Sequence, residues 1–273
     1  MRDIPPPPLD RVVSADGTPL AFTRHGQGPS LLLVHGATVD RQAWQFLTPH
    51  LQDHFAVYAL DRRGRGASGD TPPYAVEREI EDLQAVLTAL PGPVHLFGHS
   101  SGAVLALETA RRAAPGQIPR LLLYEPPLFP DLPRLPPGHA AELAALLAAG
   151  NHDRALRTFL GAGPPGLSPA AIDQMAASPR WGRTLALAHT LPYDARIVGE
   201  YDLRPERLAG RTRPSALLLG ETSPPRQRAA VEATAAALPG SQIIILPGQE
   251  HVAMVTAPEL LAAVIIRFCR APD

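Results

Sequence analysis

The segment HLFGHSSGAVLALETARRA (95–113) changes within a few residues from a continuous apolar run to a helical pattern. Between the two lies GHSSG (98–102), in which two glycines flank a serine. A nucleophile on a sharp strand-to-helix turn needs a strained backbone, and bulky side chains two positions to either side would clash with it. Gly98 and Gly102 remove those side chains. We therefore interpret the segment as a turn that presents the Ser100 hydroxyl at the edge of the core.

Around this turn, short apolar runs alternate with helical patterns. A hairpin with Asp16-Gly17 at its turn is expected over 11–26. Later strands are expected at 30–36, 55–61, 93–98, 120–127, 215–220 and 241–248. Helices are expected at 41–51, at 75–90, after Ser100, at 226–238 and from Pro258. Continuous apolar strands that alternate with helices indicate a mostly parallel sheet covered by helices on both faces.

The strand pattern stops between Pro126 and Arg213, where alanine- and leucine-rich helices are broken by proline and glycine. We interpret this stretch as a helical insertion after the sixth strand. The expected organisation is a proline-rich lead-in (1–10), an α/β core formed by 11–125 and 214–273, and a helical cap or lid (126–213).

Composition narrows the choice of partner. The 273 residues carry 25 Lys and Arg against 26 Asp and Glu, without a basic block, so a small molecule is a better expectation than nucleic acid or a membrane surface. The chain contains no lysine, which excludes Schiff-base chemistry, pyridoxal phosphate attachment and a P-loop. Cys269, the one cysteine, is expected as a buried core thiol. We expect neither a cofactor nor a metal.

The N-terminal residues MRDIPPPPLD lack the apolar core of a signal peptide, and no later stretch is long and apolar enough to span a membrane. A cytoplasmic location is therefore expected. The oligomeric state is left open.

Four motifs resemble those of the α/β-hydrolase superfamily and follow that family's order: LLLVHGAT (31–38), YALDRRGRGAS (58–68), LFGHSSG (96–102) and LPGQEHVAM (246–254). The resemblance runs from about Val12 to the C-terminus. It implies the α/β-hydrolase fold. In the family-like turn at 58–68, we interpret Asp61 and Arg65 as structural residues.

The resemblance also implies that Ser100 attacks a carbonyl and that His251 accepts its proton. A serine hydroxyl is a poor nucleophile unless an adjacent base takes the proton. His251 follows the strand at 241–248 directly, on a loop at the carboxyl edge of the sheet. The backbone N–H groups of Ala37 and Ser101 are the expected oxyanion donors.

Two other histidines lie in these motifs. His99 is expected to pack beside the nucleophile or to make a supporting hydrogen bond. His35 belongs to the turn that resembles the family's oxyanion loop.

The third member of the triad departs from the family pattern. The acid usually lies a little under thirty residues before the histidine, but this position is Ser223 in a segment, GETSPP, without aspartate. Glu125 ends the preceding strand, and some haloalkane dehalogenases of the same superfamily resemble this arrangement. We assign the acid role to Glu125 and keep Glu221 as the alternative. Asp194 and Asp202, in or near the insertion, are further candidates.

The insertion should cover Ser100 with apolar helix faces, so a neutral, hydrophobic, small to medium carboxylic ester or lactone is the expected substrate. Trp44 and Phe46 either line this pocket or pack in the core. The sequence thus predicts a serine hydrolase that forms an acyl-enzyme on Ser100. A carbon-carbon bond hydrolase or a cofactor-free perhydrolase using the same residues is the alternative, as is a non-catalytic binding protein on the same fold.

Overall fold

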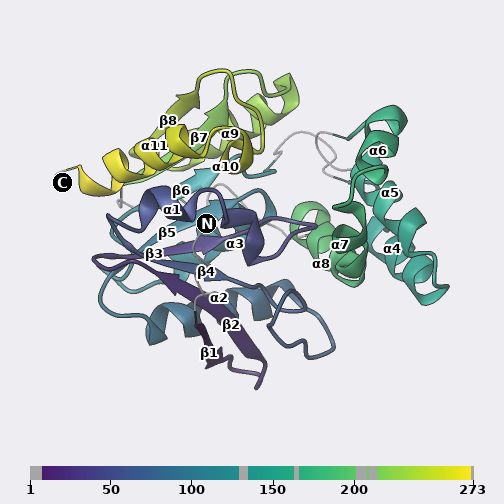
Figure 1. Ribbon diagram of the computed structural model, residues 1–273, viewed down its shortest axis with the longest axis horizontal. Helices are drawn as coiled ribbons and strands as arrows, with labels where there is room; N and C mark the ends of the chain where they lie inside the picture. Colours follow the sequence, from purple (N-terminus) through teal and green to yellow (C-terminus); the bar gives the residue numbers. More distant parts are fainter. Residues whose placement is uncertain (1–7, 129–134, 163–165, 201–207, 209–213, 272–273) are drawn as a thin grey trace, which may run out of the picture.

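A central sheet of eight strands forms the core in a computed structural model of the chain, which describes residues 8–128, 135–162, 166–200, 208 and 214–271 (Figure 1). The strands are β1 (Leu9–Val13), β2 (Pro19–His25), β3 (Ser30–Val34), β4 (Ala56–Leu60), β5 (Val94–His99), β6 (Leu121–Tyr124), β7 (Ser215–Gly220) and β8 (Ser241–Leu246). Their order is β1-β2-β4-β3-β5-β6-β7-β8. Strand β2 pairs antiparallel with β1 and β4, and all other pairs are parallel. The mostly parallel sheet is therefore confirmed.

Helices cover both faces of this sheet. The helices of the core are η1 (Arg41–Trp44), α1 (Thr48–Leu51), α2 (Val76–Ala89), α3 (Ser101–Arg112), α9 (Pro225–Ala237), α10 (Ala253–Thr256) and α11 (Pro258–Arg270). One buried apolar cluster joins the sheet to α2, α3 and α9, and a second joins it to α1, α10 and α11. Strand β3, in which four apolar residues follow Ser30, is buried at every position as a result.

The structure corrects two local predictions. The helix expected over 41–51 is interrupted: a short 3₁₀ turn, η1, ends at Trp44, and α1 begins at Thr48. Pro49 lies in the first turn of α1, because proline lacks the N–H that a helix interior requires. At the N-terminus, β1 begins at Leu9, inside the predicted lead-in, because Leu9 pairs with Thr23 of β2. Residues 1–7 lie outside the described part of the chain.

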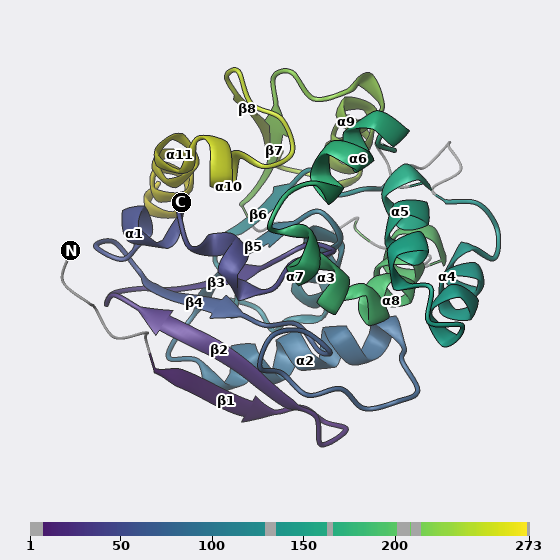
Figure 2. The ribbon, with the colours of Figure 1, turned by 45° about the vertical axis from the view of Figure 1, so that its right-hand side comes forward.

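A second group of helices lies between β6 and β7 in the sequence. It comprises α4 (His139–Ala148), α5 (His152–Ala162), α6 (Pro169–Ala176), α7 (Trp181–Ala186), η2 (Ala188–Thr190), α8 (Leu191–Ala195) and a π-helical turn, η3 (Arg196–Glu200). All of these helices except η3 contribute to a separate apolar cluster. They lie together beside the sheet (Figures 1 and 2), and η3 contacts α3. Residues 129–134, 163–165, 201–207 and 209–213 of the predicted cap lie outside the description.

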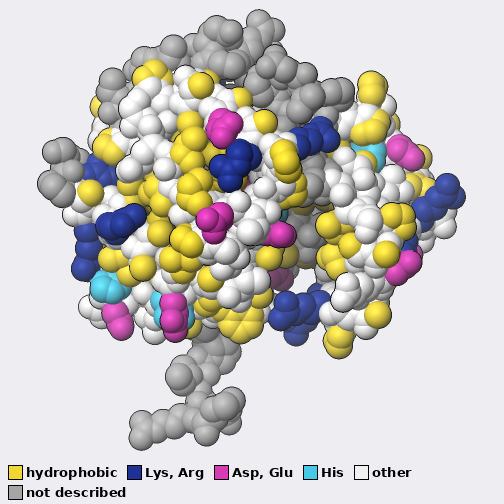
Figure 3. All heavy atoms as spheres, turned by 90° about the horizontal axis from the view of Figure 1, so that it is seen from above, with side chains coloured by type: hydrophobic (Ala, Val, Ile, Leu, Met, Phe, Trp, Pro, Cys, Tyr) yellow, Lys and Arg dark blue, Asp and Glu magenta, His cyan; other side chains and the backbone are white. Residues whose placement is uncertain are grey.

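The sheet ends on an open edge at β8. The side chains of Ile243 and Ile245 are about two-fifths exposed there. Seen from the side of β8 and α9, hydrophobic side chains form a band across the surface (Figure 3). Within the described ranges, no helix combines the length and apolar character that crossing a lipid bilayer requires.

Candidate active site

Ser100 occupies the turn between β5 and α3 with a strained backbone. Its backbone φ of 54° lies in the left-handed region, which residues other than glycine seldom adopt. Two hydrogen bonds hold this conformation: the Ser100 N–H donates to the Tyr124 carbonyl at 2.9 Å, and the Ala103 N–H donates to the Ser100 carbonyl at 2.9 Å. The side chain is half-buried at the carboxyl edge of the sheet. Ser100 thus lies on a turn between a strand and a helix, and its role as the nucleophile stays a prediction.

Close backbone approaches explain why glycines surround this serine. A Cβ at Gly98 would lie 2.6 Å from the Ala103 Cα, and one at Gly102 would lie 2.4 Å from the His35 carbonyl oxygen. A Cβ at Gly36 would lie 2.9 Å from the Ser100 Cβ. All three distances are below the closest contacts that Cβ atoms make. The absent side chains let α3 begin against the end of β3 and bring the loop after β3 next to Ser100.

Glu125 and His251 meet at the same edge of the sheet. Glu125 directly follows β6, and His251 lies in the loop after β8. The Nδ1 atom of His251 lies 2.7 Å from Oε2 of Glu125. Glu125 is fully buried, whereas the His251 side chain is about one-third exposed. The backbone of Glu125 has a φ of 46°, and its N–H donates to the Leu218 carbonyl at 3.1 Å.

The second carboxylate oxygen of Glu125 is held by the segment after β7. Oε1 accepts hydrogen bonds from the Gly220 N–H at 2.8 Å and from the Ser223 hydroxyl at 2.5 Å. Burial alone would raise the pKa of Glu125, but the hydrogen bond and charge of His251, with these two donors, hold that pKa below its usual range. Ser223, at the family's usual acid position, therefore contacts the glutamate that lies against the histidine.

The other candidate acids lie elsewhere. The Glu221 carboxylate is exposed and accepts a hydrogen bond from the Gly248 N–H at 2.8 Å, in the turn after β8. Asp194 is fully buried among arginines. Asp202 lies outside the described residues. Among the acids that the structure describes, Glu125 is the candidate that contacts His251.

His99 and Tyr124 hold the backbone around His251. Nε2 of His99 donates to the His251 carbonyl at 2.9 Å, and the Tyr124 hydroxyl donates to the Glu250 carbonyl. The Ala253 N–H donates in turn to the Tyr124 oxygen at 3.2 Å. Burial, together with the nearby His251, places the pKa of His99 well below its usual value, so this ring is neutral. His99 makes the supporting hydrogen bond that the sequence analysis expected.

The loop after β3 is held by His35. Its Nδ1 donates to the Gly36 carbonyl at 2.8 Å, and its Nε2 accepts from the Arg62 N–H at 3.3 Å. Burial and the positive charges of Arg62 and Arg65 lower the pKa of His35, so the ring stays neutral in one tautomer. Ala37 follows this loop, and Ser101 opens α3. Their roles as oxyanion donors remain predictions.

Trp44 and Phe46, which were expected either to line the pocket or to pack in the core, differ in burial. Trp44 is completely buried and packs edge-to-face on Phe97, with ring centroids 5.6 Å apart. Phe46 is exposed to about two-fifths of its surface. Trp44 therefore belongs to the core.

A buried network of charges, which the sequence patterns did not predict, lies next to the turn at Ser100. It joins Arg62 and Arg65 to Glu79 of α2 and Asp194 of α8. The three arginines of DRRGRG are a signal that could have indicated buried acidic partners, because buried guanidinium groups are nearly always paired. Asp61, in the same turn, accepts hydrogen bonds from the backbone N–H groups of Arg41 at 2.9 Å and Ala67 at 2.8 Å, as a structural residue does.

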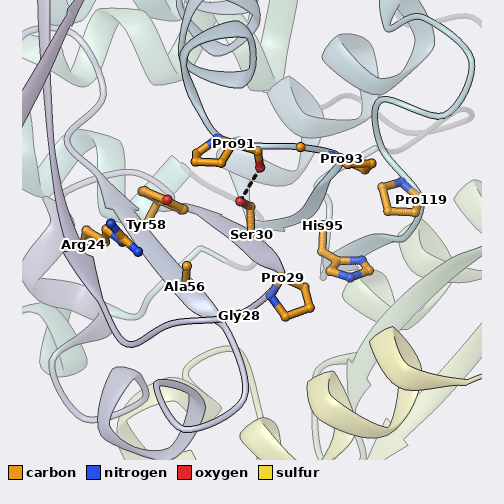
Figure 4. Close-up of a pocket in the computed structure, with 11 residues that line it drawn as sticks. Arg24, Gly28, Pro29, Ser30, Ala56, Tyr58, Pro91, Pro93, His95 and Pro119 are labelled. Carbon is orange, nitrogen blue, oxygen red and sulfur yellow. Dashed lines mark hydrogen bonds between the residues drawn. The ribbon is translucent and has the colours of Figure 1, made fainter.

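A hollow in the surface lies away from this site. A hollow of about 400 Å³ opens at the amino ends of β3, β4 and β5, the opposite edge of the sheet, and is lined by residues that include Arg24, Tyr58 and His95 (Figure 4).

Burial raises the pKa of the Cys269 thiol to about 12, so it is not a reactive thiolate. In the described part of the chain, no cluster of three or more His, Cys, Asp or Glu side chains is arranged to hold a metal ion.

Comparisons with known proteins agree with the fold. Residues 31–264 match the alpha/beta hydrolase family. A crystal structure of an alpha/beta hydrolase from Sphaerobacter thermophilus is 41% identical and covers 95% of this chain and 100% of that one, with a TM-score of 0.86. The chain is also 27% identical to 2-(acetamidomethylene)succinate hydrolase from Mesorhizobium japonicum, over 95% of each protein.

Two other relatives match over a shorter stretch. N-formylmaleamate deformylase from Pseudomonas putida is 39% identical over 120 residues, which are 42% of this chain and 44% of that protein. Pimeloyl-[acyl-carrier protein] methyl ester esterase from Methylococcus capsulatus is 36% identical over 139 residues, 50% of this chain and 53% of that protein. The chain thus matches about half the length of these two relatives.

Proposed function

The chain belongs to the alpha/beta hydrolase family, and from its site we propose a serine hydrolase that cleaves small to medium hydrophobic carboxylic esters or lactones through an acyl-enzyme on Ser100. One observation carries the proposal: the buried carboxylate of Glu125 lies 2.7 Å from Nδ1 of His251, and the strained backbone of Ser100 is hydrogen-bonded to Tyr124, the residue before Glu125. A nucleophile, a base and an acid that orients the base are the three parts of a catalytic triad.

In the proposed mechanism, the Ser100 oxygen attacks the ester carbonyl while Nε2 of His251 takes the hydroxyl proton. The imidazolium that forms keeps its Nδ1 proton directed at Glu125, whose lowered pKa leaves it ionised at neutral pH. His251 then returns the proton to the leaving alcohol. A water molecule, activated by the same base, hydrolyses the acyl-enzyme and restores Ser100.

The negative oxygen of the tetrahedral intermediate needs fixed donors. We assign this role to the backbone N–H groups of Ala37 and Ser101. The approach of Gly36 to Ser100 and the start of α3 at Ser101 support the assignment. A helix N-terminus adds partial positive charge where the oxyanion develops.

The helical segment between β6 and β7 is proposed as the lid that supplies an apolar pocket. Its buried cluster is made of alanine, leucine, isoleucine and aromatic side chains, and Ala37 of the proposed oxyanion loop packs against it. An apolar lid favours a neutral, hydrophobic substrate. The names methyl ester esterase and deformylase, given to two relatives, each describe transfer of an acyl group to water, which is the chemistry proposed here.

A fluorophosphonate probe tests the proposal, because it labels serine nucleophiles that an adjacent base activates. We expect stoichiometric labelling at Ser100 in the wild type and no labelling of Ser100→Ala. The wild type should also turn over chromogenic esters, with activity varying with acyl chain length. Labelling without turnover of any ester or lactone would favour a carbon-carbon bond hydrolase or a perhydrolase. Absence of labelling would favour a binding protein and contradict the proposal.

A further inference from the structure

A buried group of charged side chains links the helical segment to the catalytic turn. Arg62, Arg65, Glu79 and Asp194 are each at most 2% exposed, and Asp194 comes from α8 while the arginines follow β4. The ion pairs Arg62–Glu79, Arg62–Asp194 and Arg65–Asp194 measure 2.8, 3.0 and 2.7 Å. The four groups balance in charge, so none of them is left uncompensated in the interior.

Asp194 binds the residue that follows the proposed nucleophile. Its Oδ1 accepts a hydrogen bond from the Ser101 hydroxyl at 2.8 Å, and its Oδ2 accepts from Arg65. The Ser101 oxygen also accepts from the Arg62 guanidinium at 3.1 Å. The side chain of the first α3 residue is therefore held from two directions.

The same guanidinium reaches the other side of the site. Arg62 donates to the His35 carbonyl at 3.3 Å, and its backbone N–H donates to His35 Nε2. His35 directly precedes Gly36 and Ala37. The two backbone segments that carry the proposed oxyanion donors thus share one partner, Arg62, which Asp194 holds by an ion pair.

Further contacts keep α8 docked at this place. Tyr193, next to Asp194, stacks on Tyr74 with ring centroids 3.9 Å apart and donates to Asp70 at 2.8 Å. Burial alone would raise the pKa of Asp194, but the charges of Arg65 and Arg62 and the Ser101 hydrogen bond hold it at about 2. Asp194 is therefore ionised at every pH at which a neutral-pH enzyme works.

We propose that Asp194 is a positioning residue of the oxyanion hole: it fixes Ser101 directly and the loop at His35 through Arg62, so the helical segment completes the hole. The inference rests on the proposed function. It follows that α8 stays docked during turnover and that any opening of the lid occurs elsewhere. Catalysis by fixed dipoles requires such fixed donors, because donors that reorient during the reaction stabilise the oxyanion less.

The chain contains a matched control pair. Asp82 of α2 is buried and receives two hydrogen bonds from Arg63, at 2.7 and 2.6 Å. Arg63 belongs to the same DRRGRG turn but also binds Asp16, in the turn between β1 and β2. Asp82→Asn therefore removes a buried charge of the same kind without touching the proposed oxyanion donors.

The experiment compares Asp194→Asn with Asp82→Asn at matched folded fraction. Full loss of one oxyanion donor costs about 10²- to 10³-fold in kcat, so partial misplacement in Asp194→Asn should cost about 10- to 100-fold with KM changed by less than about threefold. Asp82→Asn should lower Tm and keep kcat within about threefold of wild type. Infrared difference spectra of a slowly deacylating acyl-enzyme should place the ester carbonyl stretch at higher wavenumber in Asp194→Asn, because a carbonyl that accepts weaker hydrogen bonds is less polarised.

If Asp194→Asn does not fold, Ser101→Ala replaces it, since this variant leaves every ion pair intact. Loss of one hydrogen bond predicts a fall in kcat of about 3- to 10-fold, with unchanged KM and the same direction of carbonyl shift. Equal losses of kcat in the two Asp variants, or an unshifted carbonyl stretch, would overturn the inference. A wild type that fluorophosphonate fails to label would instead show that the proposed function is wrong.

Discussion

Glu125 hydrogen-bonds His251 at 2.7 Å across 126 positions of sequence, and it does so from the end of β6. Ser223, after β7, donates its hydroxyl to the same carboxylate at 2.5 Å. The carboxylate thus lies between the histidine and the position where the family usually carries its acid. The strand end supplies the acid, and the next loop fixes its orientation.

The first prediction concerns the nucleophile. Ser100→Ala should abolish ester turnover while thermal unfolding stays close to that of the wild type, because the half-buried hydroxyl makes none of the hydrogen bonds that hold the turn. Ser101→Ala should keep about a tenth to a third of the wild-type kcat, since its backbone N–H is retained and only its side-chain hydrogen bonds are lost. Initial rates with a chromogenic ester measure both. An inactive Ser101→Ala beside an active Ser100→Ala would refute the assignment.

The second prediction concerns the acid. Glu125→Gln removes the charge that stabilises the imidazolium, and kcat should fall by about 10²- to 10⁴-fold. Glu221→Gln should cost less than about tenfold, because the Glu221 carboxylate binds the Gly248 N–H and lies exposed. Both variants are compared at matched folded fraction, since Glu125 is buried. A larger loss in Glu221→Gln than in Glu125→Gln would reverse the assignment.

The third prediction concerns Ser223. Ser223→Ala deletes a 2.5 Å hydrogen bond to the ionised Glu125 and leaves the Gly220 N–H in place. The carboxylate that orients His251 is then held less firmly, so kcat should fall by about 10-fold. The pKa of Glu125 should rise, because its ionised carboxylate loses a hydrogen-bond donor. Ser223→Thr, which keeps a hydroxyl, is the control. A kcat identical to that of the wild type in Ser223→Ala would remove Ser223 from the site.

The fourth prediction concerns stability against pH. His35 and His99 are buried, and burial lowers their folded pKa values well below 6.5, so the unfolded chain binds more protons than the folded one as pH falls through 6.5. The free energy of unfolding should therefore decrease below this pH, with a slope approaching about 1.4 kcal/mol per pH unit for each histidine.

Urea unfolding between pH 7.5 and 5 measures this slope. His25 and His95, whose pKa values burial also lowers, act in the same direction. His99→Asn keeps a side-chain donor for the His251 carbonyl while removing one titrating group, so it should flatten the curve. An unfolding free energy that stays constant over this range would contradict the buried neutral state of these rings.

Local patterns in the sequence were sufficient for most of the fold. Continuous apolar strands such as β3 and β7 are recognisable because a parallel sheet buries both faces. The turn at Ser100 is recognisable because side chains at Gly98 and Gly102 would clash with the neighbouring backbone. Pro49 was a local sign that a new helix begins near Thr48. The apolar periodicity continues across residues 41–51, however, and therefore predicted a single helix.

The choice of acid and the docking of α8 depended on tertiary structure. Glu125 and Glu221 both follow apolar strands, and only the positive φ of Glu125 and the packing of the β7–α9 segment against it direct one carboxylate to His251. Asp194 reaches Ser101 from 93 positions away, through contacts that no local periodicity encodes. The sequence by itself determined which strands form and that the chain turns at Ser100, because these features depend on neighbouring residues. The partners of its buried charges were decided by long-range packing, because each buried ion must find its counter-ion wherever the fold brings one.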